Sequence, residues 1–163
     1  MIEMNQGPVN RFAVLAVAAG IVILAGCRRE PPPPALWKSG TTVIAVNASW
    51  DAESDSTNDG SQADLHWQHV SPTEQYLSPV NGARAAIVKY RSYEQVDGVF
   101  LQRWHMPKER IPAGDADGML AGGTVVAFRT AEGTLGKLEV IGFRPAPSSD
   151  AGGIEIKWTL FQD

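Results

Sequence analysis

An uncharged run of apolar residues near the N-terminus, Phe12 to Ala25 (FAVLAVAAGIVILA), divides this chain into two unequal parts. As a helix of 14 residues it would span roughly 21 Å, which is less than the roughly 30 Å of a membrane's hydrocarbon core. That length is typical of the hydrophobic region of an export signal, and Arg11 supplies the positive charge that precedes it. Residues 1–26 are therefore predicted to be a signal segment rather than part of the folded domain.

The apolar run ends in Leu24-Ala25-Gly26-Cys27, which contains the only cysteine of the chain. These four residues resemble the lipobox of bacterial lipoproteins. The resemblance implies cleavage before Cys27, transfer of a diacylglyceryl group to its thiol, and acylation of the new amino group with a fatty acid such as palmitate. Several acyl chains anchor a protein stably. We therefore expect a lipid-anchored protein of the cell envelope. By analogy with the lipoprotein family, the absence of Asp at position 28 implies the outer membrane or the periplasmic face.

Two other interpretations of this segment remain open. Cys27 could be an incidental buried thiol, or residues 12–27 could form an uncleaved signal anchor. Arg28 and Arg29 favour the anchor, because positive charge tends to stay on the cytoplasmic side of a membrane. Lipidation has the advantage of explaining why the single cysteine lies at this position.

Residues 27–36 are predicted to be a tether between the lipid and the domain. Four consecutive prolines, Pro31 to Pro34, favour the semi-rigid polyproline II conformation, although a disordered connection would give the same architecture. Residues 37–163 then remain for the folded part. That length suits one domain with a modest core.

Composition indicates an ordinary globular domain over these residues. Hydrophobic residues make up 44% of the chain and charged residues 20%, as in typical soluble domains. Asp and Glu outnumber Lys and Arg by 18 to 14, which argues against nucleic-acid binding because nucleic-acid binders normally carry a basic face. A single cysteine excludes both an internal disulfide and a thiolate-rich zinc site.

Short runs of β-branched, aromatic and alternating residues, bounded by turn residues, indicate a fold made mainly of strands. The strand candidates cover residues 41–50, 63–67, 85–90, 123–129, 137–143 and 154–161. Ser92 is placed to cap a short helix that runs toward Trp104 and is interrupted by Gly98. The predicted fold class is mainly β: a small antiparallel β-sheet or sandwich domain with at most one short helix, after the N-terminal signal helix.

Alternation within the C-terminal strands predicts which side chains face the core. In residues 137–143 it places Phe143 on the face opposite to Leu138 and Val140. In the last strand, one face that is expected to meet the core carries Ile154, Ile156 and Trp158. Between the strands of the predicted hairpin, Gly133 and Gly136 flank a tight connection.

Residues 123–161 are similar to a hairpin-plus-strand module of uncharacterised secreted and membrane-attached bacterial proteins. The resemblance is carried by the segments FRT (128–130), EG (132–133), GKLEV (136–140) and IKW (156–158). It implies a β hairpin followed by a third strand. It implies no activity.

A looser resemblance connects the chain with haem-scavenging surface lipoproteins, which are mainly β and hold haem through pairs of histidines. The histidines here are His66, His69 and His105. Residues three apart in a strand point to opposite faces, so His66 and His69 do not form a preformed pair. We expect exposed or hydrogen-bonded histidines, and no metal or cofactor.

An acidic loop raises a calcium hypothesis. Asp51, Glu53, Asp55 and Asp59 lie close together in the sequence. Counted from Asp55, the pattern partly fits an EF-hand loop, but position 12, which requires a bidentate Glu, falls on His66. A solvated acidic loop is the preferred interpretation.

Tryptophans and histidines supply the candidate contact residues. Most of the five tryptophans are expected in the core, because they lie on alternating strands. Trp104, next to His105, is expected to be the exposed one, and a ligand or partner would contact Trp104, His105, His66 or His69.

The expected function follows mainly from the lipobox. The sequence contains no GxSxG, HExxH or P-loop motif, so we expect a protein that is not an enzyme. The predicted role is that of a membrane-anchored envelope lipoprotein whose β-rich domain is an interaction or accessory module for an envelope protein. One alternative is a lipoprotein that binds a small ligand, haem or a glycan. A hydrolase with paired carboxyl groups comes third.

Overall fold

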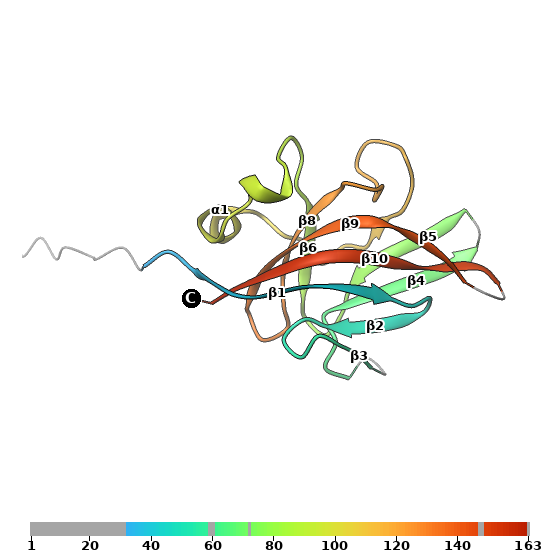
Figure 1. Cartoon of the computed structure of the whole chain (residues 1–163), viewed down its shortest axis with the longest axis horizontal. Coiled ribbons are helices and arrows are strands. Elements are labelled where there is room, and N and C mark those ends of the chain that lie inside the picture. The colour runs from blue at the N-terminus through green and yellow to red at the C-terminus, as the bar shows by residue number, and fades with distance from the viewer. Residues whose placement is uncertain (1–31, 59–60, 72, 147–148, 163) are drawn as a thin grey trace, which may run out of the picture. The chain divides into compact units, whose positions relative to one another are not determined.

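The computed structural model describes residues 32–58, 61–71, 73–146 and 149–162 (Figure 1). The predicted signal segment and Cys27 lie outside the described residues. The described residues form one compact unit. The elements are β1 (Ala35–Ile44), β2 (Ala48–Asp51), β3 (Ser56–Asn58), β4 (Leu65–Ser71), β5 (Glu74–Pro79), β6 (Arg84–Ile87), η1 (Tyr93–Gln95), α1 (Gly98–Arg103), β7 (Ile111–Pro112), β8 (Val125–Arg129), β9 (Leu135–Ala146) and β10 (Ser149–Gln162).

These strands form two antiparallel sheets of five strands each. The first sheet has the order β1-β10-β9-β8-β6, and the second has the order β3-β2-β4-β5-β7. In Figure 1 the long strand β10 runs between β1 and β9. With one short α-helix and one 3₁₀ turn, the chain is mainly β, and the predicted fold class is confirmed.

The core lies between the two sheets and is built around aromatic side chains. Trp50 of β2 packs against Phe128 of β8 with ring centroids 6.0 Å apart, and against Trp158 of β10 at 5.5 Å. Because these contacts cross from one sheet to the other, the domain is a sandwich. The predicted inward face of the last strand is confirmed by the burial of Ile154, Ile156 and Trp158.

A second apolar cluster covers the outer face of the first sheet. Tyr93 of η1 and Leu101 of α1 pack there with Leu135 of β9 and Phe161 of β10. The helix begins at Gly98 rather than being interrupted by it, since Asp97 is the N-cap and its carboxylate accepts the N–H of Phe100 at 2.8 Å. The predicted helix from Ser92 is therefore two separate pieces.

The predicted strand over residues 41–50 is wrong as a single element. It is divided between β1 and β2, which belong to different sheets. The chain turns at residues 45–47, where Asn47 has a φ of 53°, a left-handed conformation that Asn tolerates better than most residues. β1 also begins at Ala35, so the last two residues of the predicted tether belong to a sheet.

A β-bulge overturns the predicted orientation of Phe143. The register between β10 and β9 shifts after Val140, so that Ile156 pairs with Val140 whereas Ile154 pairs with Phe143. The extra residue reverses the alternation beyond that point. Phe143 consequently shares the face of Val140, and its ring centroid lies 5.6 Å from that of Trp67 in the second sheet.

Candidate functional site

Three acidic side chains, Asp51, Glu53 and Asp64, meet at one end of β2 and β4 and are called the carboxylate cluster below. One carboxylate oxygen from each lies within 4.8 Å of the others. The strand register explains two of them, because Trp50 of β2 pairs with Leu65 of β4 and this places Asp51 and Asp64 side by side. Glu53 joins them from the turn that leads to β3.

Asp64 is fully buried and connects the two sheets. Its Oδ2 accepts the main-chain N–H of Ala52 at 2.9 Å, next to β2, and its Oδ1 accepts that of Ala131 at 2.7 Å, in the turn between β8 and β9. Burial raises the pKa of Asp64 to about 7, and the charges of Glu53 and Glu132 act in the same direction, whereas the two N–H bonds oppose the rise. This carboxyl group therefore titrates near neutral pH.

Asp51 is held by the turn that follows it. Its Oδ1 accepts the main-chain N–H groups of Glu53 and Ser54 at 3.0 and 3.2 Å. Its Oδ2 accepts the Ser54 hydroxyl at 2.8 Å. These bonds fix the direction of the Asp51 carboxylate, in the manner of an Asx turn.

Glu53 differs from both aspartates because its carboxylate has no donor. Each of its two carboxylate oxygens exposes less than 1 Å² to solvent and has no hydrogen-bond partner among the described residues. The ammonium group of Lys38 comes close, but it donates to the main-chain oxygen of Glu53. A buried carboxylate beside two other acidic groups is costly unless a proton or a cation compensates it.

The cluster differs from the acidic loop that the sequence indicates. Asp51 and Glu53 belong to it, whereas Asp55 points elsewhere and accepts the indole N–H of Trp50 at 3.0 Å and the Thr42 hydroxyl at 2.6 Å. Asp59 lies outside the described residues. Sequence reasoning does not group Asp64 with the acidic loop, because the residue lies inside the predicted strand over residues 63–67 and is its only acidic residue.

The histidines do not converge. His66 shares a hydrogen bond of 2.8 Å between its Nδ1 and the Ser49 hydroxyl oxygen. His69, on the same strand, is half-buried with its Nε2 enclosed and unpartnered, and His105 is exposed on the loop after α1. Within the described segments, the carboxylate cluster is the only group of three or more side chains placed to hold a metal ion, and it contains no histidine.

Trp104 is not the exposed tryptophan that the sequence predicts. Its ring stacks on Phe100 with centroids 4.8 Å apart, and it packs against the second apolar cluster. Residues on α1 and the loop after it thus cover each other. The most exposed tryptophan is Trp37 on β1, at 40%.

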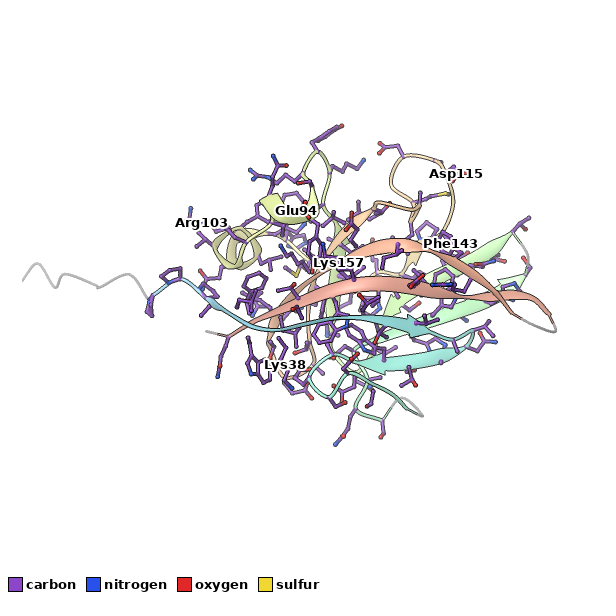
Figure 2. All side chains as sticks on the ribbon, viewed as in Figure 1. Lys38, Glu94, Arg103, Asp115, Phe143 and Lys157 are labelled. Atoms are coloured by element: carbon purple, nitrogen blue, oxygen red, sulfur yellow. The ribbon has the colours of Figure 1, made fainter. Side chains whose placement is uncertain are left out.

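A hollow of about 600 Å³ opens where the loop before β8 faces the ends of β5 and β9. Met119 and Phe143 give it an apolar side, and Thr73, Gln75 and Asp115 give it a polar side. Figure 2 shows Asp115 and Phe143 at the same end of the domain. No histidine is among its lining residues.

A smaller hollow of about 380 Å³ lies beside β1 and is lined by Leu36 and by the aromatic and cationic residues around η1. Lys137 is buried there, and its ammonium donates to the carbonyls of Tyr93 and Val96 at 2.6 and 2.7 Å. Burial lowers the pKa of Lys137. Because these bonds satisfy the ammonium group, Lys137 has a structural role: it holds η1 on the sheet.

Lys157 lies on the outside of the same hollow. Its ammonium is 4.3 Å from the centroid of the Tyr93 ring and 3.6 Å from a carboxylate oxygen of Glu94, and Figure 2 shows Lys157 and Glu94 near each other.

In the part of the chain that the structure describes, no helix has the length and apolar character needed to span a membrane. Comparison with known proteins gives no relatives: no protein family, no curated protein and no solved structure matches this chain.

Proposed function

We propose that the chain is a lipoprotein of the bacterial cell envelope, anchored through Cys27, and that its β-sandwich binds an envelope protein rather than catalysing a reaction. One observation supports the binding of a partner by the β-sandwich. The first strand of the domain exposes two neighbouring large apolar side chains, Leu36 at 67% and Trp37 at 40%. Adjacent exposed apolar side chains are typical of surfaces that bind a partner.

The position of these residues favours a partner at the membrane. Ala35 is eight positions after Cys27 in the chain, so the two Cα atoms cannot be more than about 29 Å apart even when the segment is fully extended. The end of this segment is also packed on the domain, because Pro34 lies against Gly98, where an added Cβ would come within 2.9 Å of the Pro34 main-chain oxygen. If Cys27 carries lipid, Leu36 and Trp37 are held close to the bilayer surface.

The free edge of the first sheet suggests how a partner could bind to β1. β1 is the last strand in the order of that sheet, and its only strand partner among the described residues is β10. A free edge can accept an extended segment of another protein as an additional strand. We propose such a segment, from a membrane-bound envelope protein, as the partner.

The carboxylate cluster does not favour the hydrolase alternative. Glycoside hydrolysis needs two carboxyl groups that both reach the substrate. Here Asp64 is fully buried, and both carboxylate oxygens of Glu53 are closed to solvent. A sugar ring could not contact this pair without rearrangement of the turn after β2.

A second candidate function, the carriage of a small ligand, is favoured by the hollow beside Phe143. Its volume of about 600 Å³ lies in the range of small-molecule sites. Phe143 is 42% exposed, and its ring offers a face on which a sugar or another flat ligand could stack. The absence of histidine from the lining gives no support to haem held by a histidine pair.

Site-specific photo-crosslinking in living cells tests the partner proposal. A photoreactive residue at position 37 should give one discrete adduct with a membrane-bound protein, and Leu36→Asp should remove that adduct. The matched control is position 90, since Tyr90 is 97% exposed but lies on the loop before η1. Equal crosslinking from positions 37 and 90, or none from position 37, would contradict a binding surface on β1.

A further inference from the structure

We propose that the carboxylate cluster of Asp51, Glu53 and Asp64 is a calcium-binding site. Among the described residues, no group in contact with the carboxylate of Glu53 compensates its burial. Both of its carboxylate oxygens are enclosed and accept no hydrogen bond from any described residue, yet the group is aimed at two other carboxylates. A protein rarely encloses a carboxylate without a compensating group. A cation between the three side chains supplies that group.

Among the described residues, no basic side chain forms an ion pair with a carboxylate of the cluster. Lys38, whose ammonium reaches this turn, is bound to the main-chain oxygen of Glu53 and lies over the ring of Trp37 at 4.6 Å from its centroid. Glu132 adds a further negative charge near Asp64. The local field is therefore negative, which attracts a cation to this end of β2.

The ligand atoms are all carboxylate oxygens, which select hard cations over zinc or copper. Oxygens on opposite sides of a calcium ion are about 4.8 Å apart, and about 4.2 Å apart around magnesium. Three oxygens within 4.8 Å of one another therefore fit into a calcium sphere. Calcium also accepts irregular geometry and completes its shell with water, which suits a site of two side chains from the turn after β2 and a third from the start of β4.

Hydrogen bonds outside the cluster orient two of the three ligands. The main-chain N–H of Ala131 directs Asp64 from the opposite sheet, at 2.7 Å. The Ser54 hydroxyl directs Asp51, at 2.8 Å. Such bonds to ligating carboxylates are a regular feature of metal sites, and they reduce the entropy lost when the ion binds. Glu53, which has no such bond, would close onto the ion last.

Terbium luminescence tests the site, because Tb³⁺ replaces Ca²⁺ and is excited by nearby tryptophan, here Trp50 next to Asp51. The full-length chain in detergent, stripped with a chelator, should give a saturable signal with one Tb³⁺ per chain. Excess Ca²⁺ should displace the bound Tb³⁺. The same concentration of Mg²⁺ should displace at least tenfold less Tb³⁺.

The key variant is Glu53→Gln, because the Glu53 side chain makes no hydrogen bond whose loss would harm the fold. We expect it to weaken Tb³⁺ binding at least tenfold, whereas Glu109→Gln, an exposed acidic position on the loop before β7, should bind as the unmodified chain does. Ca²⁺ should also raise the Tm of the unmodified chain by about 5 °C, and not that of Glu53→Gln.

A proton held by Asp64 is the competing explanation of the enclosed carboxylates, and the same experiment separates this explanation from the calcium site. Absence of a saturable Tb³⁺ signal, or equal Tb³⁺ affinity of the unmodified chain and Glu53→Gln, would overturn the calcium site. The proposal does not depend on lipidation of Cys27 or on a partner at β1.

Discussion

The carboxylate of Asp64, at the start of β4, accepts a hydrogen bond of 2.7 Å from the main-chain N–H of Ala131, in the turn between β8 and β9. These residues belong to different sheets and are far apart in the sequence. With the second bond, from the buried N–H of Ala52, one buried side chain holds a main-chain group next to each sheet. Asp64 therefore has a structural role whether or not it also binds an ion.

Replacing Asp64 by Ala should destabilise the domain by about 1 to 3 kcal/mol, because it leaves the buried N–H of Ala52 without an acceptor and removes the bond to the N–H of Ala131. Urea unfolding followed by tryptophan fluorescence measures this, and Asp117→Ala is a suitable control since the Asp117 side chain is 83% exposed. An unchanged free energy of unfolding in Asp64→Ala would mean that the two sheets do not depend on this side chain.

Stability in the presence of a chelator should fall as the pH rises from about 5 to about 8. The pKa of Asp64 is raised by burial from 3.8 to about 7 in the folded chain, so the folded state holds a proton in this interval that the unfolded state has released. The sign follows from linkage: folding takes up a proton, and raising the pH opposes it. Above the folded pKa the loss is complete.

The difference in Tm between the unmodified chain and Asp64→Asn, measured at each pH, isolates this contribution from that of the histidines. As the pH rises through 7, the Tm of the unmodified chain should fall relative to the Tm of Asp64→Asn. Saturating Ca²⁺ should reduce the pH dependence of the unmodified chain, because the ion replaces the proton as the compensating charge. A difference that is independent of pH would show that Asp64 does not titrate near neutrality.

Gly136 of β9 should not tolerate a side chain. A Cβ at this position would overlap the ring of Phe128, which is fully buried on the neighbouring strand. We expect Gly136→Ala to cost about 1 to 3 kcal/mol through overpacking. Gly142→Ala, on the same strand, is the matched control, since no atom lies within 4 Å of its added Cβ. Equal free energies of unfolding for the two variants would contradict this description of the core.

Trp37→Ala should leave the free energy of unfolding within about 0.5 kcal/mol of the unmodified chain, because the residue is partly exposed and lies at a bulge in the pairing of β1 with β10. The same change should reduce crosslinking to the membrane partner. A large loss of stability would instead assign Trp37 to the core and remove the main support for a binding surface on β1.

Local patterns in the sequence predict many of the strands and the side chains that face the core. Ile154, Ile156 and Trp158 alternate without interruption and lie where the alternation predicts, because a strand buried on one face imposes this period. The same rule fails at Phe143, where a bulge reverses the faces, and at Asn47, where a left-handed residue ends one strand and starts another. Neither irregularity changes composition or polarity, so neither has a clear signal in a single sequence.

The candidate site was only partly accessible to sequence reasoning, because its members come together through long-range pairing. Asp51 and Glu53 are close together in an acidic segment, and that pattern by itself suggests ligands for a cation. Asp64 joins them through the pairing of β2 with β4, and its burial depends on Ala131 in the other sheet. The prediction that Trp104 is exposed fails for a similar reason. The sequence contains no sign that Phe100 and the second apolar cluster cover this side chain.

Metabolic labelling with radioactive palmitate tests most directly whether lipid on Cys27 holds the chain at the cell envelope. Cells that produce the unmodified chain should incorporate label into a band of the mature size, and Cys27→Ala should abolish both the label and the cleavage. A chain that carries no label although it is produced, or a Cys27→Ala variant that is labelled equally, would contradict the account.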